Sequence, residues 1–458
     1  MQAFDAIIVG AGQAGAPLAG RLSEAGMKVA LVERKFLGGT CVNTGCMPTK
    51  ALVASAYAIY MARRAADFGV STGAVAIDMA AVEARARRVI LDARGNNERW
   101  LGGLEGLTLL RGHARFTGPQ TIAVDGEELT APRIFLNVGG RASVPDLPGV
   151  DQVPHLDNTD MVALDTLPRH LIVVGGSYIG LEFAQMYRRF GAEVTVVERA
   201  PRLIAREDED ISEAIRGILD DEGITVRTGA SCIALAPHEE GVAVSVDCFK
   251  DEPVICGSHV LLAVGRRPNT DDLGLDAAGV ATDQRGYVTV NDRLETSAPG
   301  IWALGDCNGR GAFTHTAYND FEIVAANLLD GADRSLAQRI TGYALYIDPP
   351  LGRVGMSETE ARRSGRRILV STRPMTRVGR AIEKGETKGF MKLVADAETQ
   401  RILGAAILGT GGDEAIHGIV DTMSADRPLS DLRWAVPIHP TVSELIPTLI
   451  LGLKEPDS

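Results

Sequence analysis

Short apolar runs alternate with segments of helical periodicity along most of the chain. An apolar run at residues 6–9 leads into a glycine turn, a helical segment at 18–25 and a second apolar run at 28–32. The same order returns between residues 171 and 197. Short buried strands that alternate with helices are typical of parallel sheets covered by helices. The pattern therefore predicts an α/β protein that carries this unit twice.

The pattern changes after residues 348–350. Short strands are expected at 367–372, 389–394 and 402–408, together with two helices, which indicates a separate α+β domain. Proline and glycine mark extended crossovers near residue 148 and at 265–268. We therefore expect the second α/β unit to be inserted into the first, with boundaries at 1–148, 149–268, 269–336 and 337–458.

Both units carry a glycine turn between a strand and a helix, followed by an acid at the end of the next strand. The first has Gly10, Gly12, Gly15 and Glu33, and the second has Gly175, Ser177, Gly180 and Glu198. Such glycines allow a pyrophosphate to approach the backbone at a helix N-terminus, and the acid accepts from a ribose hydroxyl. Ser177 replaces one glycine, so we expect looser nucleotide binding there. The sequence thus predicts two dinucleotide sites.

Cys41 and Cys46 lie in the stretch GGTCVNTGCMPTK, which precedes an expected helix at 51–66. With Pro48 expected as the first helical residue, the pair lies at a helix N-terminus, which favours a thiolate. A reactive dithiol is the favoured interpretation. A structural disulfide and half of a zinc site are the alternatives, but no further ligands lie nearby. The four other cysteines show no paired motif and are expected to be buried fillers: Cys232, Cys248, Cys256 and Cys307.

Two further features suggest chemistry. Asp306 ends an expected strand at 301–306, where it can reach a ligand, and His439 and Glu444 place an imidazole near a carboxylate. An expected helix at 80–101 carries several arginines, but interleaved acids favour a solvated face.

Composition limits the possible partners. The chain has 458 residues, 45% of them hydrophobic, and a formal net charge of −12, which argues against nucleic acid or an anionic membrane as partner. It shows neither a long apolar run nor the features of a signal peptide at its start. We expect a soluble cytoplasmic protein.

Together these motifs resemble those of the class I pyridine nucleotide-disulfide oxidoreductases, with closest similarity to their mercuric-reductase-like and reactive-chlorine-resistance branches. GAGQAG, GGTCVNTGCMPTK, GGSYIGLE, IWALGD and HPTVSE occur in the order found in that family. The resemblance implies an FAD domain in two parts, an inserted NAD(P) domain and a C-terminal domain that forms a homodimer. It also implies that electrons pass from NAD(P)H through FAD and the Cys41–Cys46 disulfide to a substrate.

The resemblance assigns a role to individual residues. Cys46 would lie against the flavin, Cys41 would exchange with substrate, and Lys50 and Glu182 would form an ion pair beside the flavin. His439 and Glu444 would be an acid/base dyad that reaches the active site of the other subunit, and Tyr178 would cover the nicotinamide pocket. The remaining cofactor contacts implied are Gly10, Gly12, Gly15, Glu33, Thr40, Lys50, Ala114, Gly139, Asp306 and Thr314 for FAD, and Gly175, Ser177, Gly180, Glu198 and Gly265 for NAD(P)H.

Two differences refine the expected function. Asn137 and Val138 stand where the family usually has Ala-Thr, and no cysteine follows Cys307, whereas mercuric reductases carry a cysteine pair near the C-terminus. We expect no bound metal, a preference for NADH because Glu198 would repel a 2′-phosphate, and a disulfide, oxidant or metal ion as substrate. The alternatives are a dihydrolipoamide dehydrogenase of a multienzyme complex and a redox-responsive binding protein without turnover.

Overall fold

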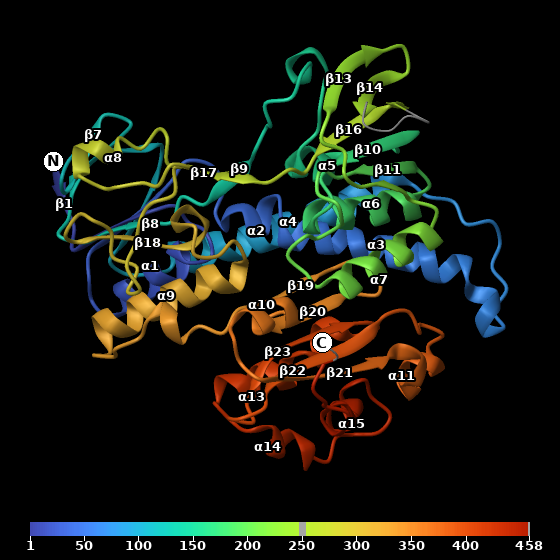
Figure 1. The fold of residues 1–458 in the computed structure, drawn as a ribbon. Helices are drawn as coiled ribbons and strands as arrows, with labels where there is room; N and C mark the ends of the chain where they lie inside the picture. The colour runs from blue at the N-terminus through green and yellow to red at the C-terminus, as the bar shows by residue number, and fades with distance from the viewer. Residues whose placement is uncertain (247–252, 457–458) are drawn as a thin grey trace.

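The computed structural model describes residues 1–246 and 253–456. Three bodies are arranged along the chain, each with its own sheet (Figure 1). No helix within the described ranges is long and apolar enough to cross a membrane. The α/β architecture with two parallel sheets and a C-terminal α+β unit is confirmed.

The first sheet has five parallel strands in the order β18-β8-β2-β3-β4. Two helices, α1 (Gly15–Glu24) and α9 (Thr314–Leu329), bury apolar side chains against one face. A four-stranded sheet in the order β1-β7-β6-β5 covers the other face. The strands span Gln2–Ala3 (β1), Ala6–Val9 (β2), Val29–Glu33 (β3), Leu107–Arg111 (β4), Ala114–Gly118 (β5), Thr121–Val124 (β6), Glu127–Thr130 (β7), Ile134–Leu136 (β8) and Ile301–Ala303 (β18).

The second parallel sheet has the order β12-β11-β10-β16. Helices α6 (Tyr178–Phe190) and α7 (Glu209–Asp221) pack on one face, and an antiparallel β13-β14-β15 sheet packs on the other. The elements from the outgoing to the return crossover span Gly140–Ala142 (β9), Asn158–Ala163 (α5), His170–Val174 (β10), Glu193–Val197 (β11), Thr225–Arg227 (β12), Ile233–His238 (β13), Gly241–Val246 (β14), Val254–Gly257 (β15), His259–Leu262 (β16) and Arg266–Pro268 (β17). Helix α8 (Leu275–Ala278) follows the return crossover and packs in the core of the first unit.

The two crossovers between these units pair with each other. Strand β9 leaves the first unit, β17 returns to it, and the two form an antiparallel ribbon. The ends of the inserted unit are therefore adjacent, as Figure 1 shows between the left and upper bodies.

The C-terminal body is an antiparallel sheet in the order β19-β20-β23-β22-β21. We call it the interface domain. Strands β19 and β20 were not expected, because both are short and contain glycine, and more helices form than the two expected. Its elements span Gly342–Leu345 (β19), Leu351–Gly355 (β20), Glu358–Arg363 (α10), Ile368–Pro374 (β21), Gly379–Glu383 (α11), Phe390–Asp396 (β22), Ile402–Leu408 (β23), Gly412–Ala415 (α12), His417–Ser424 (α13), Leu429–Arg433 (α14) and Ile446–Leu451 (α15).

Three helices near the centre of the molecule carry the cysteine stretch and its support: α2 (Gly39–Asn43), α3 (Cys46–Arg63) and α4 (Met79–Gly102). The expected start of α3 was wrong by several residues. Cys46, and not Pro48, is the first residue of the helix, and Gly45 is its N-cap. The interpretation of α4 as a solvated face was also wrong for two arginines, since Arg85 donates to the carbonyl of Ala51 and Arg94 donates to Asn43.

Candidate active site

The first glycine turn forms a narrow backbone cradle at the start of α1. Gly10 has a φ of +102°, and a Cβ on Gly15 would lie 2.0 Å from the carbonyl oxygen of Gly10. The Glu33 carboxylate accepts from the backbone N–H of Ala11 at 2.9 Å and from that of Lys35 at 2.8 Å. A cradle that only glycine fits, at a helix N-terminus, suits the pyrophosphate of a dinucleotide such as FAD.

The second glycine turn repeats this geometry. Gly175 has a φ of +119°, and a Cβ on Gly180 would lie 2.0 Å from the carbonyl oxygen of Gly175. The Glu198 carboxylate accepts from the N–H groups of Gly176 and Ala200, both at 2.6 Å. Ser177 is the N-cap of α6. The two units thus use one local design, which suits a second dinucleotide here.

The cysteine stretch is tied to the first glycine turn. The N–H of Gly38 donates to the carbonyl of Ala11 at 2.8 Å, and the side chain of Gln13 donates to the carbonyl of Gly38 at 3.0 Å. A Cβ on Gly39 would lie 2.9 Å from the Cα of Gly12. This close contact fixes α2, and with it Cys41 and the exposed Thr40, directly beside the cradle.

Cys41 and Cys46 are both free thiols, and their surroundings differ. A hydrogen bond from Cys41 lowers the pKa of Cys46 to about 6, helped by the hydroxyl of Thr314, whose Oγ1 lies 3.2 Å from Sγ, and by the Lys50 ammonium. The same hydrogen bond, together with burial, raises the pKa of Cys41. At neutral pH the pair therefore holds one thiolate, at the first residue of α3, and one thiol that can exchange with a substrate.

Lys50 and Glu182 form an ion pair beside the thiolate, with Nζ 2.7 Å from Oε2. Glu182 is buried, and it also accepts from the N–H of Tyr346 at 3.0 Å. The Tyr346 ring lies 4.4 Å below the Lys50 ammonium. Tyr346 had no local sequence signal, because it reaches the site from the interface domain.

Asn43 on α2 and Arg94 on α4 stabilise the cysteine stretch. The Asn43 amide donates to the carbonyls of Leu37 and Gly39, both at 2.9 Å, and its oxygen accepts from Arg94 at 2.7 Å. The Arg94 guanidinium also stacks on Phe36 at 3.6 Å. These supporting residues were missed, since the arginine pattern of α4 resembled a solvent-exposed face.

Asn137 joins three segments of the first cradle. Its side chain accepts from the N–H of Gly15 at 2.9 Å and donates to the carbonyl of Leu304 at 3.0 Å. The next turn, at Gly305, carries Asp306, whose pKa is raised by burial and which lies 3.8 Å from Arg266. The Asn137 side chain thus makes polar contacts that an alanine at this position could not make.

The other expected contacts lie around the same cradle or its counterpart. Ala114 begins β5, Gly139 follows β8 with a φ of +65°, and Thr314 begins α9. Gly265, with a φ of +133°, lies at the return crossover.

Tyr178 is the first residue of α6, directly after the second glycine turn. Its ring lies 6.1 Å from the ring of Phe313. Phe313 precedes Thr314, so the Tyr178 ring lies between the second glycine turn and the segment that contacts Cys46.

The His439 imidazole and the Glu444 carboxylate form a pair, with Nδ1 2.8 Å from Oε2. His439 is 81% exposed and Glu444 only 15%. Figure 1 shows α14, which ends shortly before His439, on the far side of the interface-domain sheet from α2. Within the described residues, the hydrogen bonds of this pair join His439, Glu444 and Thr441, and none reaches Cys41 or Cys46.

The expectation that the remaining cysteines are buried fillers is only partly correct. Cys307 is buried, and Cys256 is only half-buried, with its sulfur 3.6 Å from His238. Cys232 is disulfide-bonded, so the filler interpretation was wrong for it. Cys248 lies outside the described residues.

Two segments of the chain, which together cover most of it, match known families. Residues 4–320 match the family described as pyridine nucleotide-disulphide oxidoreductase, and residues 341–450 match the dimerisation domain of pyridine nucleotide-disulphide oxidoreductases.

Similar proteins match over nearly the whole chain. A probable pyridine nucleotide-disulfide oxidoreductase, RclA, from Escherichia coli is 36% identical over 99% of this chain and 100% of its own. A dihydrolipoyl dehydrogenase from Thermus scotoductus is 34% identical over 97% and 96%, and a mercuric reductase from Staphylococcus aureus is 32% identical over 96% and 81%. The solved Cu(II) complex of the HOCl-induced flavoprotein disulfide reductase RclA has a TM-score of 0.90 at 35% identity, over 98% of this chain and 99% of that one.

Proposed function

Because the chain belongs to the pyridine nucleotide-disulphide oxidoreductase family, we propose that it takes electrons from NAD(P)H through FAD and passes them to a substrate through Cys41 and Cys46. The observation that carries the proposal is the unequal dithiol. One sulfur is held as a thiolate beside Lys50 and Thr314, and the other is a thiol on the adjoining helix.

The residues around the two cradles suit the cofactors. The turn from Gly10 to Gly15, with Glu33, would hold the pyrophosphate and adenosine of FAD, while Asp306 would hold its ribityl chain. The counterpart turn with Glu198 would hold the nicotinamide nucleotide. Bound FAD would supply a two-electron carrier between nicotinamide and disulfide.

The chain's own groups then move protons and exchange sulfur bonds. Reduction of the Cys41–Cys46 disulfide takes two electrons and two protons and gives the dithiol. Cys41 attacks a substrate disulfide as a thiolate, and Cys46 then attacks Cys41, which restores the disulfide and releases two substrate thiols. An imidazole oriented by a carboxylate accepts the proton of Cys41 and returns it to the leaving thiol.

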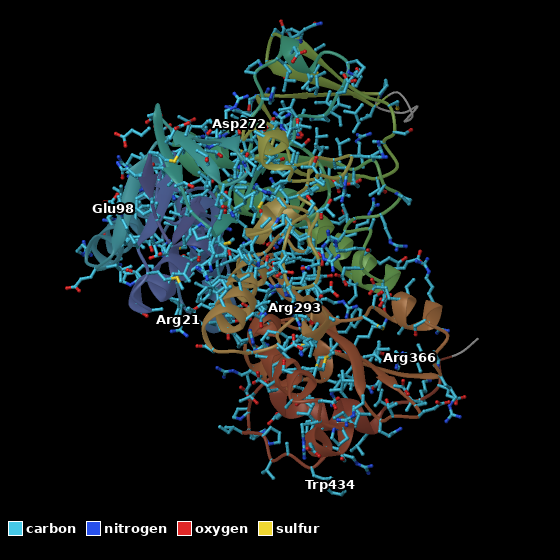
Figure 2. The ribbon with its side chains drawn as sticks, turned by 90° about the vertical axis from the view of Figure 1, so that its left-hand side faces the viewer. Arg21, Glu98, Asp272, Arg293, Arg366 and Trp434 are labelled. Atoms are coloured by element: carbon cyan, nitrogen blue, oxygen red, sulfur yellow. The ribbon has the colours of Figure 1, made fainter. Side chains whose placement is uncertain are left out.

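His439 and Glu444 supply that group only if two chains associate. Trp434, Val436 and Ile438 lead up to His439 and are 76%, 96% and 79% exposed. Figure 2 shows Trp434 at the outer end of the interface domain. A run of exposed apolar side chains in a dimerisation domain supports a homodimer in which His439 of the partner subunit serves each dithiol.

The substrate class follows from the relatives. One relative was solved as a Cu(II) complex and is described as HOCl-induced, so we propose an oxidant or a thiol-binding metal ion as the substrate. The dyad and the 34% identical dihydrolipoyl dehydrogenase support dihydrolipoamide as second candidate. We further infer a preference for NADH and a cytoplasmic location.

A substrate screen tests the proposal. The purified FAD-bound protein is assayed for NADH oxidation with Cu(II), Hg(II), a quinone, oxidised glutathione and, in the NAD⁺ direction, dihydrolipoamide. Turnover that is lost in Cys41→Ser is expected with Cu(II) or another oxidant. If dihydrolipoamide alone supports such turnover, the second candidate is correct, and if no substrate requires Cys41, the proposal fails.

A further inference from the structure

The Tyr178 ring is enclosed by side chains from three parts of the chain. The Tyr343 ring lies 5.4 Å away at 83°, and the Phe313 ring lies 6.1 Å away at 90°. The guanidinium of Arg206 lies over the Tyr178 ring at 5.2 Å and also over the Tyr343 ring at 6.0 Å. Edge-on ring contacts and a cation over a ring are both attractive. These contacts stabilise the Tyr178 ring in its present place.

Tyr343 is itself fixed in two ways. Its ring stacks on Phe313 at 5.5 Å and 13°, and its hydroxyl donates to the carboxylate of Glu207. Burial, followed by the nearby Glu207 charge, raises the pKa of Tyr343, so the phenol stays a donor at neutral pH. Tyr343 comes from β19 of the interface domain, whereas Glu207 precedes α7 of the inserted unit.

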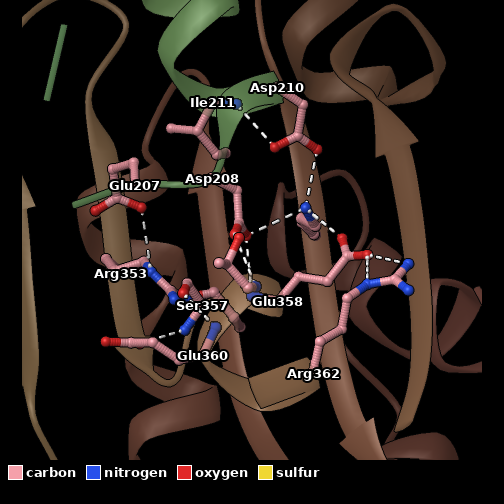
Figure 3. A network of polar contacts seen from close by, with 12 residues as sticks. Glu207, Asp208, Asp210, Ile211, Arg353, Ser357, Glu358, Glu360 and Arg362 are labelled. Atoms are coloured by element: carbon pink, nitrogen blue, oxygen red, sulfur yellow. Dashed lines mark hydrogen bonds and ion pairs between the residues drawn. The ribbon is translucent and has the colours of Figure 1, made fainter. Parts of the chain in front are cut away.

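Glu207 cannot move away from this position, because the segment from Glu207 to Asp210 is anchored in the interface domain. Glu207 is 2% exposed and lies 3.3 Å from Arg353. Asp208 accepts from the backbone N–H groups at the start of α10, and Lys392 lies 3.2 Å from Asp208 and 2.9 Å from Asp210. Figure 3 shows these contacts between the two domains. Glu207, the partner of Tyr343, thus belongs to a segment with several charged contacts to the interface domain.

We propose that Tyr343, held by Glu207, is a positioning residue that keeps the Tyr178 ring in the nicotinamide pocket when no nucleotide is bound. The inference rests on the proposed function and on the role that the family resemblance implies for Tyr178, that of covering this pocket. A nucleotide must displace the Tyr178 ring, so each contact that holds the ring lowers the apparent affinity for the nucleotide. Removing one aromatic partner is expected to tighten nucleotide binding by about two- to ten-fold.

This expectation separates positioning from structural damage, because damage to the site weakens binding and loss of a restraint strengthens it. The test measures the Kd of NAD⁺ for the oxidised, FAD-bound protein by calorimetry. Tyr343→Ala removes the ring, and Tyr343→Phe keeps the ring but removes the bond to Glu207. Tyr57→Phe is the matched control, because Tyr57 also donates from its phenol to an interface-domain carboxylate, that of Glu386, at 2.7 Å.

We expect a lower Kd in Tyr343→Ala, a smaller decrease in Tyr343→Phe and no change in Tyr57→Phe. In a Tyr178→Ala background, Tyr343→Ala should have no further effect, since the ring that it holds is gone. An unchanged or higher Kd in Tyr343→Phe overturns the inference. If Tyr343→Ala does not fold, the Kd of Tyr343→Phe alone tests the inference. An equal decrease in the Tyr178→Ala background also overturns it.

Failure of the proposed function would look different. In that case the wild-type protein would bind no NAD⁺, or NADH would not bleach its flavin absorbance. If only the inference fails, the wild-type protein still binds NAD⁺ and NADH still bleaches its flavin absorbance. Only the Kd values of the Tyr343 variants then differ from those expected.

Discussion

At the scale of single residues, the two cysteines are made unequal by a hydrogen bond between them. The Cys41 thiol donates to Cys46, and this bond is the main cause of the low pKa of Cys46. The thiolate is the reactive form, so Cys46 is protonated and slow below that pKa, of about 6, and reactive above it. Cys41 remains protonated through the same range.

We therefore predict that, in the reduced protein stripped of FAD, alkylation by iodoacetamide occurs first at Cys46, with a rate that rises through pH about 6. Cys41→Ala removes the donor and should shift this midpoint upward. Cys41→Ser retains a hydroxyl donor and should shift it less. Mass spectrometry of the alkylated peptides at several pH values measures both effects. A midpoint in Cys41→Ala equal to that of the wild-type protein would show that the hydrogen bond has no influence.

His439 should affect only the step that involves substrate thiols. We predict that His439→Ala slows turnover with a thiol or disulfide substrate by about 10²- to 10⁴-fold, the usual contribution of a general base. The rate of flavin bleaching by NADH should change little, because hydride transfer needs no proton from this residue. Stopped-flow absorbance separates the two half-reactions, and an equal loss in both would mean that the imidazole has a structural role.

Residues with a local motif could be expected from the sequence, and residues that act across domains could not. Cys41, Cys46 and Glu33 lie in short patterns whose spacing itself indicates their chemistry. Arg94 and Tyr343 contact the site from segments far away in sequence, and no pattern near them indicates which surface they face.

At the scale of elements, we expect the second glycine turn and the end of β11 to select the nucleotide. Glu198 is held by two backbone N–H groups, so its charge is fixed at the end of the strand. Among the arginines that follow, Arg202 donates to backbone carbonyls and Arg206 lies over Tyr178, which leaves the exposed Arg199 as the nearest candidate for a 2′-phosphate.

This arrangement predicts a higher kcat/KM for NADH than for NADPH. Glu198→Gln removes the repelling charge and should reduce the difference, while Arg199→Ala should increase it. Steady-state assays with both nucleotides measure the ratio. A wild-type preference for NADPH would show that arginine attraction exceeds the repulsion by Glu198.

Most strands and long helices could be expected from apolar runs and glycine turns. The start of α3 was misplaced, because proline marks the first turn of a helix without fixing which residue of that turn it occupies. Here the cap is Gly45, so the helix begins at the cysteine itself. The error matters, since it places Cys46 closer to the positive end of the helix than expected.

At the scale of the whole molecule, the proposed homodimer has a consequence that can be measured. If each site combines the dithiol of one chain with His439 of the partner subunit, a mixed dimer of Cys41→Ser and His439→Ala chains contains one complete site. We predict that co-expression of the two inactive variants restores about a quarter of wild-type activity, since about half of the dimers are mixed. Separately purified variants that are not allowed to exchange subunits are the control. If no activity returns after co-expression, the site lies within one chain.

The order of the units could be expected from the sequence because the fingerprint occurs twice with equal spacing. The contacts that join the units could not. Lys392, for example, is a lone lysine in an apolar strand, and only the fold brings Asp208, Asp210 and Glu358 to it.

The paired crossovers β9 and β17 make the inserted unit an exchangeable module. Its two ends leave the first unit side by side, so a homologous nucleotide domain can replace it without lengthening either connection. The exchange is constrained where the inserted unit contacts the rest of the chain. A replacement without the carboxylates of Glu207 to Asp210 would leave the buried Arg353 without its carboxylate partner and the buried Lys392 with Glu358 alone, and a replacement without Glu182 would remove the partner of Lys50. A chimaera designed to change nucleotide specificity should therefore keep that segment and the residues of α6 that contact Lys50 and Asp348, and exchange the rest.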